Sequence, residues 1–390
     1  MQTDELIQVL ERDAVSIFSL SSLHEALSSG KRLRVKLGAD PNRPDLHLGH
    51  SVVLRKLRLF QEAGHEVVFV IGDFTAMIGD PSGKSKTRSP LTFEETRANS
   101  ESYFRQVGKI LDPEKTLITY NSEWLLRMNF SEILSLAGKY TLARILERDD
   151  FANRFTEKQP IGLHEIFYPL IQGYDSVALS ADIEVGGTDQ TFNLLVGREL
   201  QRDYGQMPQT VLTFPLLPGL DGVEKMSKSL NNYIGIDEDP ETMFAKAMRV
   251  PDSVLPTYFR LTTDLSEESW MPILRESSYD AHFCYANEIV TLYHGANAAV
   301  QAENRYRAVS SGNIPERIPE YSLPVGSIDL PEILVRAGLA VSKSEARRLI
   351  TGGGIRVDET VVTNLAHTID SKNTPLIRRG KNRFVRIIPE

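Results

Sequence analysis

A strand, a helix and a second strand follow one another near the start of the chain. Residues 32–37 alternate basic and apolar side chains and predict a strand, while residues 49–63 place apolar side chains at helical spacing. Residues 66–71 are mostly β-branched and apolar, which is typical of a strand buried on both faces of a parallel sheet. Because parallel strands are joined by helical crossovers, this order predicts an α/β fold with a doubly wound parallel sheet.

Beyond this α/β part, the sequence pattern changes twice, first to a helical segment and then to a small C-terminal unit. The pattern from residue 240 to about residue 313 is helical and offers few candidate strands. Residues 314–327 contain three prolines and predict a linker, which sets apart a small unit over residues 328–390. A length of 390 residues fits two or three domains.

The composition is that of an ordinary globular protein, with 41% hydrophobic and 25% charged residues. It excludes a disordered or collagen-like chain, and no apolar run approaches the ~18 residues of a membrane helix. Cys284 is the only cysteine, which excludes an intrachain disulfide and a zinc site of several cysteines. The first residues are acidic and do not form a secretory signal, so we expect a cytoplasmic protein without a membrane partner.

The net charge of −8 argues against a general nucleic-acid binder, but this average hides a division of charge. Residues 331–390 carry eleven Lys and Arg against six Asp and Glu, a net charge of +5. The preceding residues carry 33 Lys and Arg against 46 Asp and Glu, a net charge of −13. A basic C-terminal module that follows an acidic main part of the chain predicts one local surface for binding nucleic acid.

The first segment suited to phosphate chemistry places His47 and His50 on either side of Gly49, where a loop becomes a helix. The first turn of a helix offers free backbone N–H groups and the positive end of the helix dipole, and imidazoles can donate further hydrogen bonds to phosphate. Taken alone, the segment is equally compatible with two surface histidines. A metal site is less favoured, because no partner segment offers ligands at an established spacing.

The second such segment is Lys-Met-Ser-Lys-Ser at residues 225–229, which follows a turn-rich approach. Two lysines on a small loop can meet the negative charge that builds on a departing pyrophosphate. A solvated loop is the simpler interpretation of a lone lysine pair. In combination with the upstream histidines, phosphate chemistry is the better interpretation.

Together these segments resemble the two signatures of class I aminoacyl-tRNA synthetases, His-x-Gly-His and KMSKS, in the right order. Further motifs resemble the bacterial tyrosyl-tRNA synthetases over essentially the whole chain. The resemblance implies a Rossmann-like parallel-sheet catalytic domain over residues 1–232, with an inserted dimerisation segment at about 110–190. It also implies an α-helical anticodon-binding domain over residues 233–320 and a small α+β RNA-binding module of the ribosomal small-subunit protein four type over residues 328–390.

Tyr168, Gln172 and Asp175 stand at positions i, i+4 and i+7, so one face of a helix presents all three. This helix resembles the tyrosine-binding helix of the family. The resemblance implies that Tyr168 and Gln172 hold the substrate's amino group and that Asp175 accepts a hydrogen bond from its phenol. Without the other motifs, an amphipathic helix with polar edges would be about as good an interpretation.

The Gly-rich segment at 72–88 resembles the corresponding loop of the family, and we expect it to be a polar loop. A P-loop is disfavoured, because Gly79 and the Gly-Lys pair at 83–84 are separated by three residues and not four. The resemblance implies that Asp80 binds the substrate's ammonium group. It also implies possible contacts to substrate or triphosphate from Thr75, Lys84 and Arg88.

The resemblance assigns the remaining residues by motif. Catalysis would use His47, His50, Lys225 and Lys228. ATP would be bound by Gly38, Asp40, His47, Gly49, His50, Gly187, Asp189, Lys225, Met226, Ser227, Lys228 and Ser229, with Asp189 on a ribose hydroxyl. Tyrosine would be bound by Asp80, Tyr168, Gln172, Asp175 and Gln190. RNA would be bound by Lys343, Arg347, Arg348 and Arg356, from a capped basic helix and the strand after it.

The implied activity is that of a tyrosine–tRNA ligase and homodimer, with tRNA(Tyr), L-tyrosine and ATP as partners and Mg²⁺ assisting. Tyrosine reacts with ATP to give tyrosyl-adenylate and pyrophosphate, and the terminal ribose of tRNA then attacks the adenylate. No resident metal is implied. One departure is Lys36, which occupies a position where many tyrosyl enzymes carry a tyrosine that donates to the phenol. Lysine there is typical of a second bacterial subgroup.

Three other interpretations remain. A tryptophanyl enzyme shares the fold but is disfavoured by Asp175 and by the basic module. A small-molecule nucleotidyltransferase of the same superfamily would lack the helical domain and the basic tail. A catalytically silent RNA-binding or regulatory protein would not need both signature loops intact.

Overall fold

The structure is a computed structural model that describes residues 2–42, 45–80, 91–311, 318–380 and 383–390. Two predicted substrate contacts, Lys84 and Arg88, lie outside the described residues. The chain divides into two compact units, Met1–Gly295 and Ala296–Glu390.

The first unit is built on a six-stranded sheet. Its strands, in spatial order, are β1 (Ser16–Phe18), β6 (Thr210–Phe214), β5 (Ile183–Gly187), β2 (Arg34–Ala39), β3 (Glu66–Ile71) and β4 (Thr116–Tyr120). Only β1 runs antiparallel to its neighbour, and the other five strands are parallel. The predicted parallel α/β sheet is confirmed.

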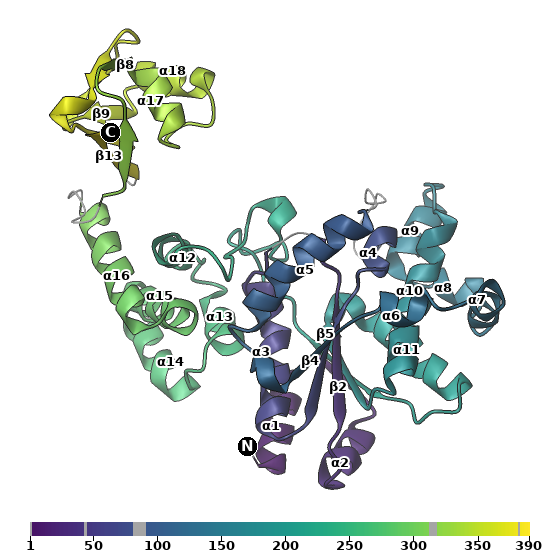
Figure 1. Cartoon of the computed structure of the whole chain (residues 1–390). Helices are drawn as coiled ribbons and strands as arrows, with labels where there is room; N and C mark the ends of the chain where they lie inside the picture. The colour runs from purple at the N-terminus through teal and green to yellow at the C-terminus, as the bar shows by residue number, and fades with distance from the viewer. Residues whose placement is uncertain (1, 43–44, 81–90, 312–317, 381–382) are drawn as a thin grey trace. The chain divides into compact units, whose positions relative to one another are not determined.

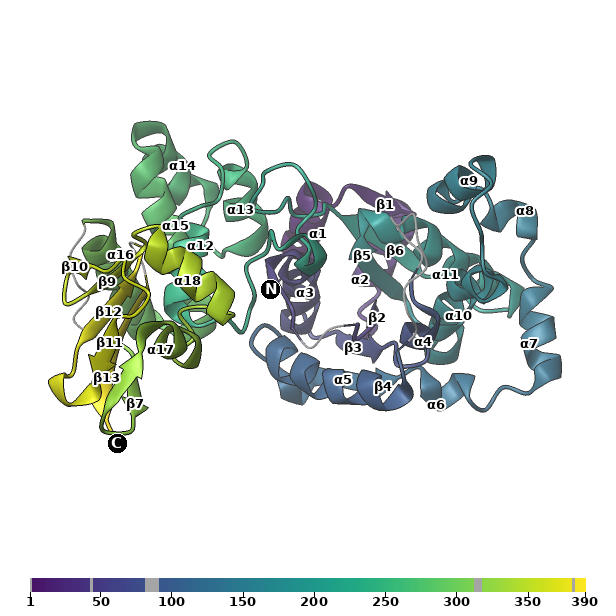
Figure 2. The same cartoon turned by 90° about the horizontal axis from the view of Figure 1, so that it is seen from above.

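Helices cover both faces of this sheet, so most residues of its central strands are buried. Figure 1 and Figure 2 show α3 (Leu48–Glu62) on one face and α10 (Leu163–Leu179) with α11 (Thr191–Asp203) on the other. Five of the six residues of β3 and all five residues of β6 are buried between these layers. The expected strand at 66–71 and the expected helix at 49–63 agree with β3 and α3.

Further helices complete the first unit. These are α1 (Thr3–Asp13), α2 (Leu20–Ser28), α4 (Thr75–Ile78), α5 (Phe93–Val107), α6 (Ser122–Leu125), α7 (Phe130–Ala137), α8 (Leu142–Ile145), α9 (Asp149–Thr156), α12 (Pro240–Ala247), α13 (Leu255–Thr262), α14 (Glu267–Glu276) and α15 (Ser278–His294). Single 3-10 turns are η1 (Pro113–Lys115), η2 (Thr188–Gln190) and η3 (Lys228–Leu230). The expected loop at 72–88 was wrong in part, because α4 begins at Thr75, whose buried hydroxyl bonds Asp40.

The second unit begins with α16 (Ala296–Ser310) and contains a small α+β module. The module has two helices, α17 (Leu330–Arg336) and α18 (Lys343–Thr351), and one 3-10 turn, η4 (Ser371–Asn373). Its five-stranded sheet has the order β10 (Thr360–Val361), β9 (Ile355–Val357), β12 (Leu376–Arg379), β13 (Arg383–Pro389) and β7 (Glu320–Leu323). Strands β11 (Thr368–Asp370) and β8 (Ser327–Asp329) pair separately.

Part of the expected linker at 314–327 is a strand. Residues Glu320–Leu323 form β7 and pair in parallel with β13, so that Leu323 joins the buried core of the module. Flanking prolines suggested a break in structure, but proline is tolerated at the ends of a short edge strand. In the described part of the chain, no helix is long and apolar enough to cross a membrane.

Candidate active site

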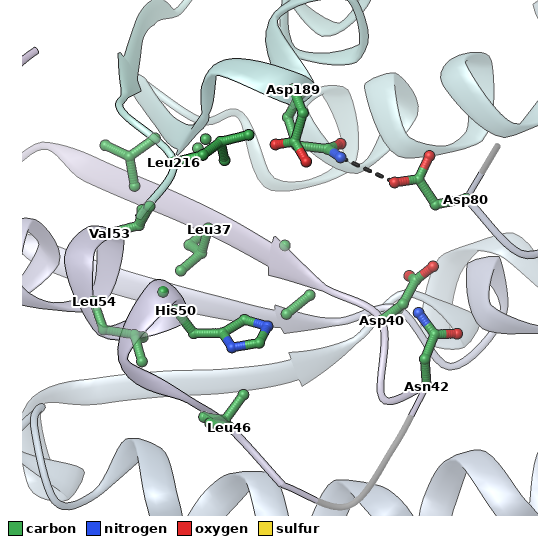
Figure 3. Close-up of a pocket in the computed structure, with 18 of the residues that line it drawn as sticks. Leu37, Asp40, Asn42, Leu46, His50, Val53, Leu54, Asp80, Asp189 and Leu216 are labelled. Atoms are coloured by element: carbon green, nitrogen blue, oxygen red, sulfur yellow. Dashed lines mark hydrogen bonds between the residues drawn. The ribbon is translucent and has the colours of Figure 1, made fainter. Parts of the chain in front are cut away.

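A cavity of about 580 Å³ opens where β2, β3 and β5 end. The carboxyl ends of parallel strands are the usual ligand-binding edge of such a sheet. Figure 3 shows His50, Asp40, Asp80 and Asp189 around this cavity, although they come from four separate segments. Every described residue that is predicted to bind ATP or tyrosine lines it.

The two histidines lie at the start of α3 and are held by backbone groups. Nδ1 of His47 accepts the N–H of Gly49 at 3.2 Å, and Nδ1 of His50 accepts the N–H of His47 at 3.2 Å. Burial and the charge of Lys228 lower the pKa of His50 to about 4, and burial lowers the pKa of His47 even further below its ordinary value. Both rings are therefore neutral at pH 7, and each carries its proton on Nε2 as a hydrogen-bond donor.

Both lysines of the 225–229 loop contact acidic residues of other segments. Lys225 Nζ lies 2.8 Å from Asp189 Oδ2, just beyond β5. Lys228 Nζ donates to the backbone oxygen of Asp45, before α3. These contacts bring the lysine loop beside the histidines, about 175 residues away in sequence, as the phosphate interpretation requires.

A second cluster surrounds the carboxylate of Asp40 at the end of β2. Thr75 Oγ1 donates to Asp40 Oδ1 at 2.6 Å, and the hydroxyl of Tyr168 donates to Asp40 Oδ2 at 2.9 Å. Burial and the negative charge of Asp40 raise the pKa of Tyr168 well above its ordinary value, so this phenol stays protonated. A Cβ on Gly72 would lie 2.2 Å from Asp40 Oδ1 and 2.2 Å from Thr75 Oγ1, so only glycine fits there.

Amide side chains connect the remaining predicted tyrosine contacts. Gln190 Nε2 donates to Asp80 Oδ2 at 2.9 Å, the bond drawn in Figure 3. Asn193 Nδ2 donates to Gln190 Oε1 and to Gln172 Oε1, both at 3.0 Å. Asn193 was missed in the sequence, although its place one helical turn after Gln190 could have suggested it.

Asp175 is buried in α10 and has two donors that the sequence analysis missed. Trp124 Nε1 donates to Asp175 Oδ1 at 2.9 Å, and Asn121 Nδ2 donates to Oδ2 at 3.4 Å. Burial raises the pKa of Asp175 to about 7, against the opposing effects of the Lys36 charge and the two hydrogen bonds. Trp124 is one of the two tryptophans of the chain, and this rarity is the only signal in the sequence that could have found it.

Four cations predicted to bind RNA lie in the second unit, and all four are exposed: Lys343, Arg347, Arg348 and Arg356. The hydroxyl of Ser342 accepts the N–H of Glu345 and caps α18, as the sequence predicted. On this helix Ala346 and Ile350 are buried in the module, so its arginines project from the opposite face.

No group of three or more His, Cys, Asp or Glu side chains is arranged to hold a metal ion in the described ranges. The one cysteine of the chain, Cys284, lies outside the cavity lining. The histidines, lysines and carboxylates that line the cavity are suited to positioning a ligand and stabilising charge.

Comparisons with known proteins agree with this description. Residues 28–310 match the family model for tRNA synthetases class I (W and Y), and residues 330–374 match the S4 domain. The tyrosine–tRNA ligase of Moorella thermoacetica is 51% identical over 374 residues, which cover 94% of this chain and 91% of the relative. That of Deinococcus radiodurans is 50% identical over 398 residues, covering 99% and 97%.

Solved structures share the fold. A tyrosyl-tRNA synthetase from Archaeoglobus fulgidus, complexed with L-tyrosine, matches with a TM-score of 0.64 at 23% identity, covering 77% of this chain and all of that one. A tryptophanyl-tRNA synthetase from Plasmodium falciparum matches with a TM-score of 0.60 at 17% identity, covering 76% of this chain and 89% of that one. At these identities the two structures support the fold alone.

Proposed function

Since the chain belongs to the class I tRNA synthetases for tryptophan and tyrosine, and among them to the tyrosine–tRNA ligases, we propose that its cavity is where tyrosine and ATP react. A tyrosine–tRNA ligase joins L-tyrosine to ATP with release of pyrophosphate, and then transfers tyrosine to the 3′-terminal ribose of tRNA(Tyr). The observation that carries the proposed site is that one cavity holds both signature loops together with the buried carboxylate of Asp175.

The first step needs no nucleophile from the protein, because the tyrosine carboxylate itself attacks the α-phosphorus of ATP. His47 and His50 donate through Nε2–H to phosphate oxygens at the N-terminus of α3, the positive end of the helix dipole. Lys225 and Lys228 exchange their contacts with Asp189 and Asp45 for the departing pyrophosphate, whose negative charge grows in the transition state. Asp189 is then free to accept a hydrogen bond from a ribose hydroxyl.

Tyrosine is recognised at both of its ends. The hydroxyl of Tyr168 donates to Asp40, so its oxygen can accept from the substrate's ammonium group beside Gln172 and Asp80. At the other end Asp175 accepts a hydrogen bond from the phenol hydroxyl. Phenylalanine would leave this buried carboxylate without that donor, and an unsatisfied buried charged group is costly.

Magnesium is proposed to arrive with ATP and not as a resident ion. Mg²⁺ is commonly held by substrate phosphates with few protein ligands, and the described residues offer no cluster that would bind it alone. The metal would supply further positive charge at the phosphates.

A homodimer is proposed through the segment at 110–190. Seven large apolar side chains of this segment are exposed: Leu117, Leu126, Phe130, Leu134, Leu142, Phe155 and Leu163. Phe130 is 73% exposed and Leu163 78%, which favours a covering partner over solvent. A second copy fits because a surface of this kind can pair with itself. Phe130→Asp should give a monomer in sedimentation, whereas Val300→Asp on α16 should not, and a dimeric F130D would contradict this surface.

Transfer RNA is proposed to contact the exposed cations of α18 and β9 and the helical region over residues 233–320. Phosphate neutralisation by Lys and Arg explains the concentration of positive charge in the module. A cytoplasmic location belongs to the same proposal, because the reaction requires ATP and tRNA together.

The proposed phosphate site is tested by Lys228→Ala. We expect this variant to slow tyrosine-dependent ATP–pyrophosphate exchange while its tyrosine affinity stays that of the parent chain. Lys115→Ala, which removes a lysine exposed on η1, serves as the matched control and should leave both quantities unchanged. Unchanged exchange in K228A would contradict the role given to the loop.

A further inference from the structure

An ion pair lies buried in the sheet beneath the proposed tyrosine site. The side chains of Lys36 and Glu184 are 1% and 2% exposed, and Lys36 Nζ lies 2.9 Å from Glu184 Oε1. The two residues are register partners on the parallel strands β2 and β5, so they project from the same face of the sheet. That face is covered by α10 and α11.

A closed set of hydrogen bonds joins this pair to α10. Lys36 Nζ donates to Ser176 Oγ at 2.7 Å, and Ser176 Oγ donates to Glu184 Oε2 at 3.0 Å. Gln209 Nε2 donates to the same carboxylate oxygen at 2.5 Å. A Cβ on Gly197 of α11 would lie 3.0 Å from both Ser176 Oγ and Gln209 Nε2, so the helix backbone packs tightly over these bonds.

Ser176 is the residue after Asp175, so the pair is anchored to the turn of α10 that carries the proposed phenol acceptor. Two neutral donors reach the Asp175 carboxylate from the end of β4 and from α6, namely Asn121 and Trp124. The charged groups that act on it are Lys36 from β2, which favours its ionised form, and Glu184 from β5, which opposes it more weakly.

Within α10 itself, the hydroxyl of Tyr168 lies nearby in the cavity lining but is protonated and neutral. The Lys36 ammonium is therefore the cation that acts on Asp175. Fold stability alone does not account for a buried pair of this kind, because apolar residues of similar volume are often equally stable in its place.

We propose that Lys36 is a positioning residue for tyrosine recognition: paired with Glu184 and bonded to Ser176, it fixes the Asp175 turn and keeps the Asp175 carboxylate ionised as the phenol acceptor. The inference rests on the proposed function, in which Asp175 receives the phenol. Lys36 then contributes to selecting tyrosine through charge and not through a direct contact.

Two variants that should shift the ionisation of Asp175 in opposite directions test this inference. K36M/E184Q removes both charges of the ion pair, but the glutamine amide oxygen at position 184 can still accept hydrogen bonds from Gln209 and Ser176. E184Q alone leaves the positive charge of Lys36 in place. The measurement is the Kd of L-tyrosine by equilibrium dialysis without ATP, from pH 5.5 to 8.5. In the unaltered chain, binding should weaken below a midpoint near pH 7, where Asp175 takes up a proton.

We expect the midpoint of K36M/E184Q to rise, with tyrosine binding at pH 7 roughly tenfold weaker for each unit of that rise. The midpoint of E184Q should fall. A merely structural role would weaken binding equally at every pH, so unmoved midpoints, or shifts of both variants in the same direction, would overturn the inference. If K36M/E184Q does not fold, E184Q decides alone, and a midpoint that fails to fall overturns it.

Asp175→Asn separates this inference from the proposed function. Retained tyrosine affinity in D175N would mean that Asp175 is not the phenol acceptor, and both ideas would fail. Lost affinity in D175N, combined with unmoved midpoints in the two pair variants, would refute the role of Lys36 alone.

Discussion

Trp124→Phe tests the proposed phenol acceptor from outside the cavity lining. The change keeps an aromatic ring but removes the indole N–H that donates to Asp175 Oδ1 at 2.9 Å. The second donor, Asn121, lies 3.4 Å away and cannot replace it. A hydrogen bond to a charged group contributes about 1.5–3 kcal/mol, so its loss disfavours ionisation of Asp175 by about 10- to 100-fold.

The sign of the effect follows from the protonation equilibrium. The pKa of Asp175 is already raised to about 7 by burial, so roughly half of the groups are ionised at pH 7. Removing a donor raises this pKa further, so that at pH 7 only a few per cent of the Asp175 groups, or fewer, are ionised. The kcat/KM for tyrosine in ATP–pyrophosphate exchange should fall about tenfold or more at pH 7 and recover partly at pH 8.5, while the KM for ATP stays constant.

Trp270→Phe is the matched control, because Trp270 is even more deeply buried than Trp124 but its indole nitrogen has no hydrogen-bond partner among the described residues. It stacks on Phe259, in the helical region away from the cavity lining. Its replacement should leave tyrosine kinetics unchanged. A kcat/KM for tyrosine within twofold of the parent in W124F, or a loss of the same size at every pH, would refute the reasoning.

Two further changes are predicted from the geometry. Gly72→Ala places a Cβ 2.2 Å from oxygens of Asp40 and Thr75. Thermal unfolding should therefore show that the free energy of unfolding falls by about 1–3 kcal/mol, and tyrosine binding should weaken. An unchanged Tm and an unchanged KM for tyrosine would contradict the close packing. Replacing both Arg347 and Arg348 by Gln should lower kcat/KM for tRNA but not pyrophosphate exchange, and should reduce the salt dependence of tRNA binding by a log–log slope of roughly 1.5–2. An unaltered salt slope would remove these arginines from the RNA surface.

The parts of the fold that could be predicted depend on local patterns. The mostly β-branched run at 66–71 forms the buried strand β3, and the Ser342 hydroxyl caps α18 by accepting the N–H of Glu345, only three residues away. Tyr168 and Asp175 share a helix face because of helical spacing alone. The two signature loops could be placed together only through the resemblance, since about 175 residues separate them.

The parts that could not be predicted depend on pairing between distant segments. The contact of Trp124 with Asp175 requires that the end of β4 meets α10, and the Lys36–Glu184 pair requires the register of β2 on β5. In the sequence, Lys36 therefore stood out only as a departure from a motif. Strand β7 was hidden for the same reason, because its pairing partner β13 lies some 60 residues later.

The most direct test of the central claim is ATP–pyrophosphate exchange by the intact chain, measured with each of the twenty amino acids. The proposed site predicts exchange with L-tyrosine and rejection of phenylalanine, because Asp175 requires the phenol. Exchange that depends on tryptophan, or that phenylalanine supports as well as tyrosine does, would contradict the account.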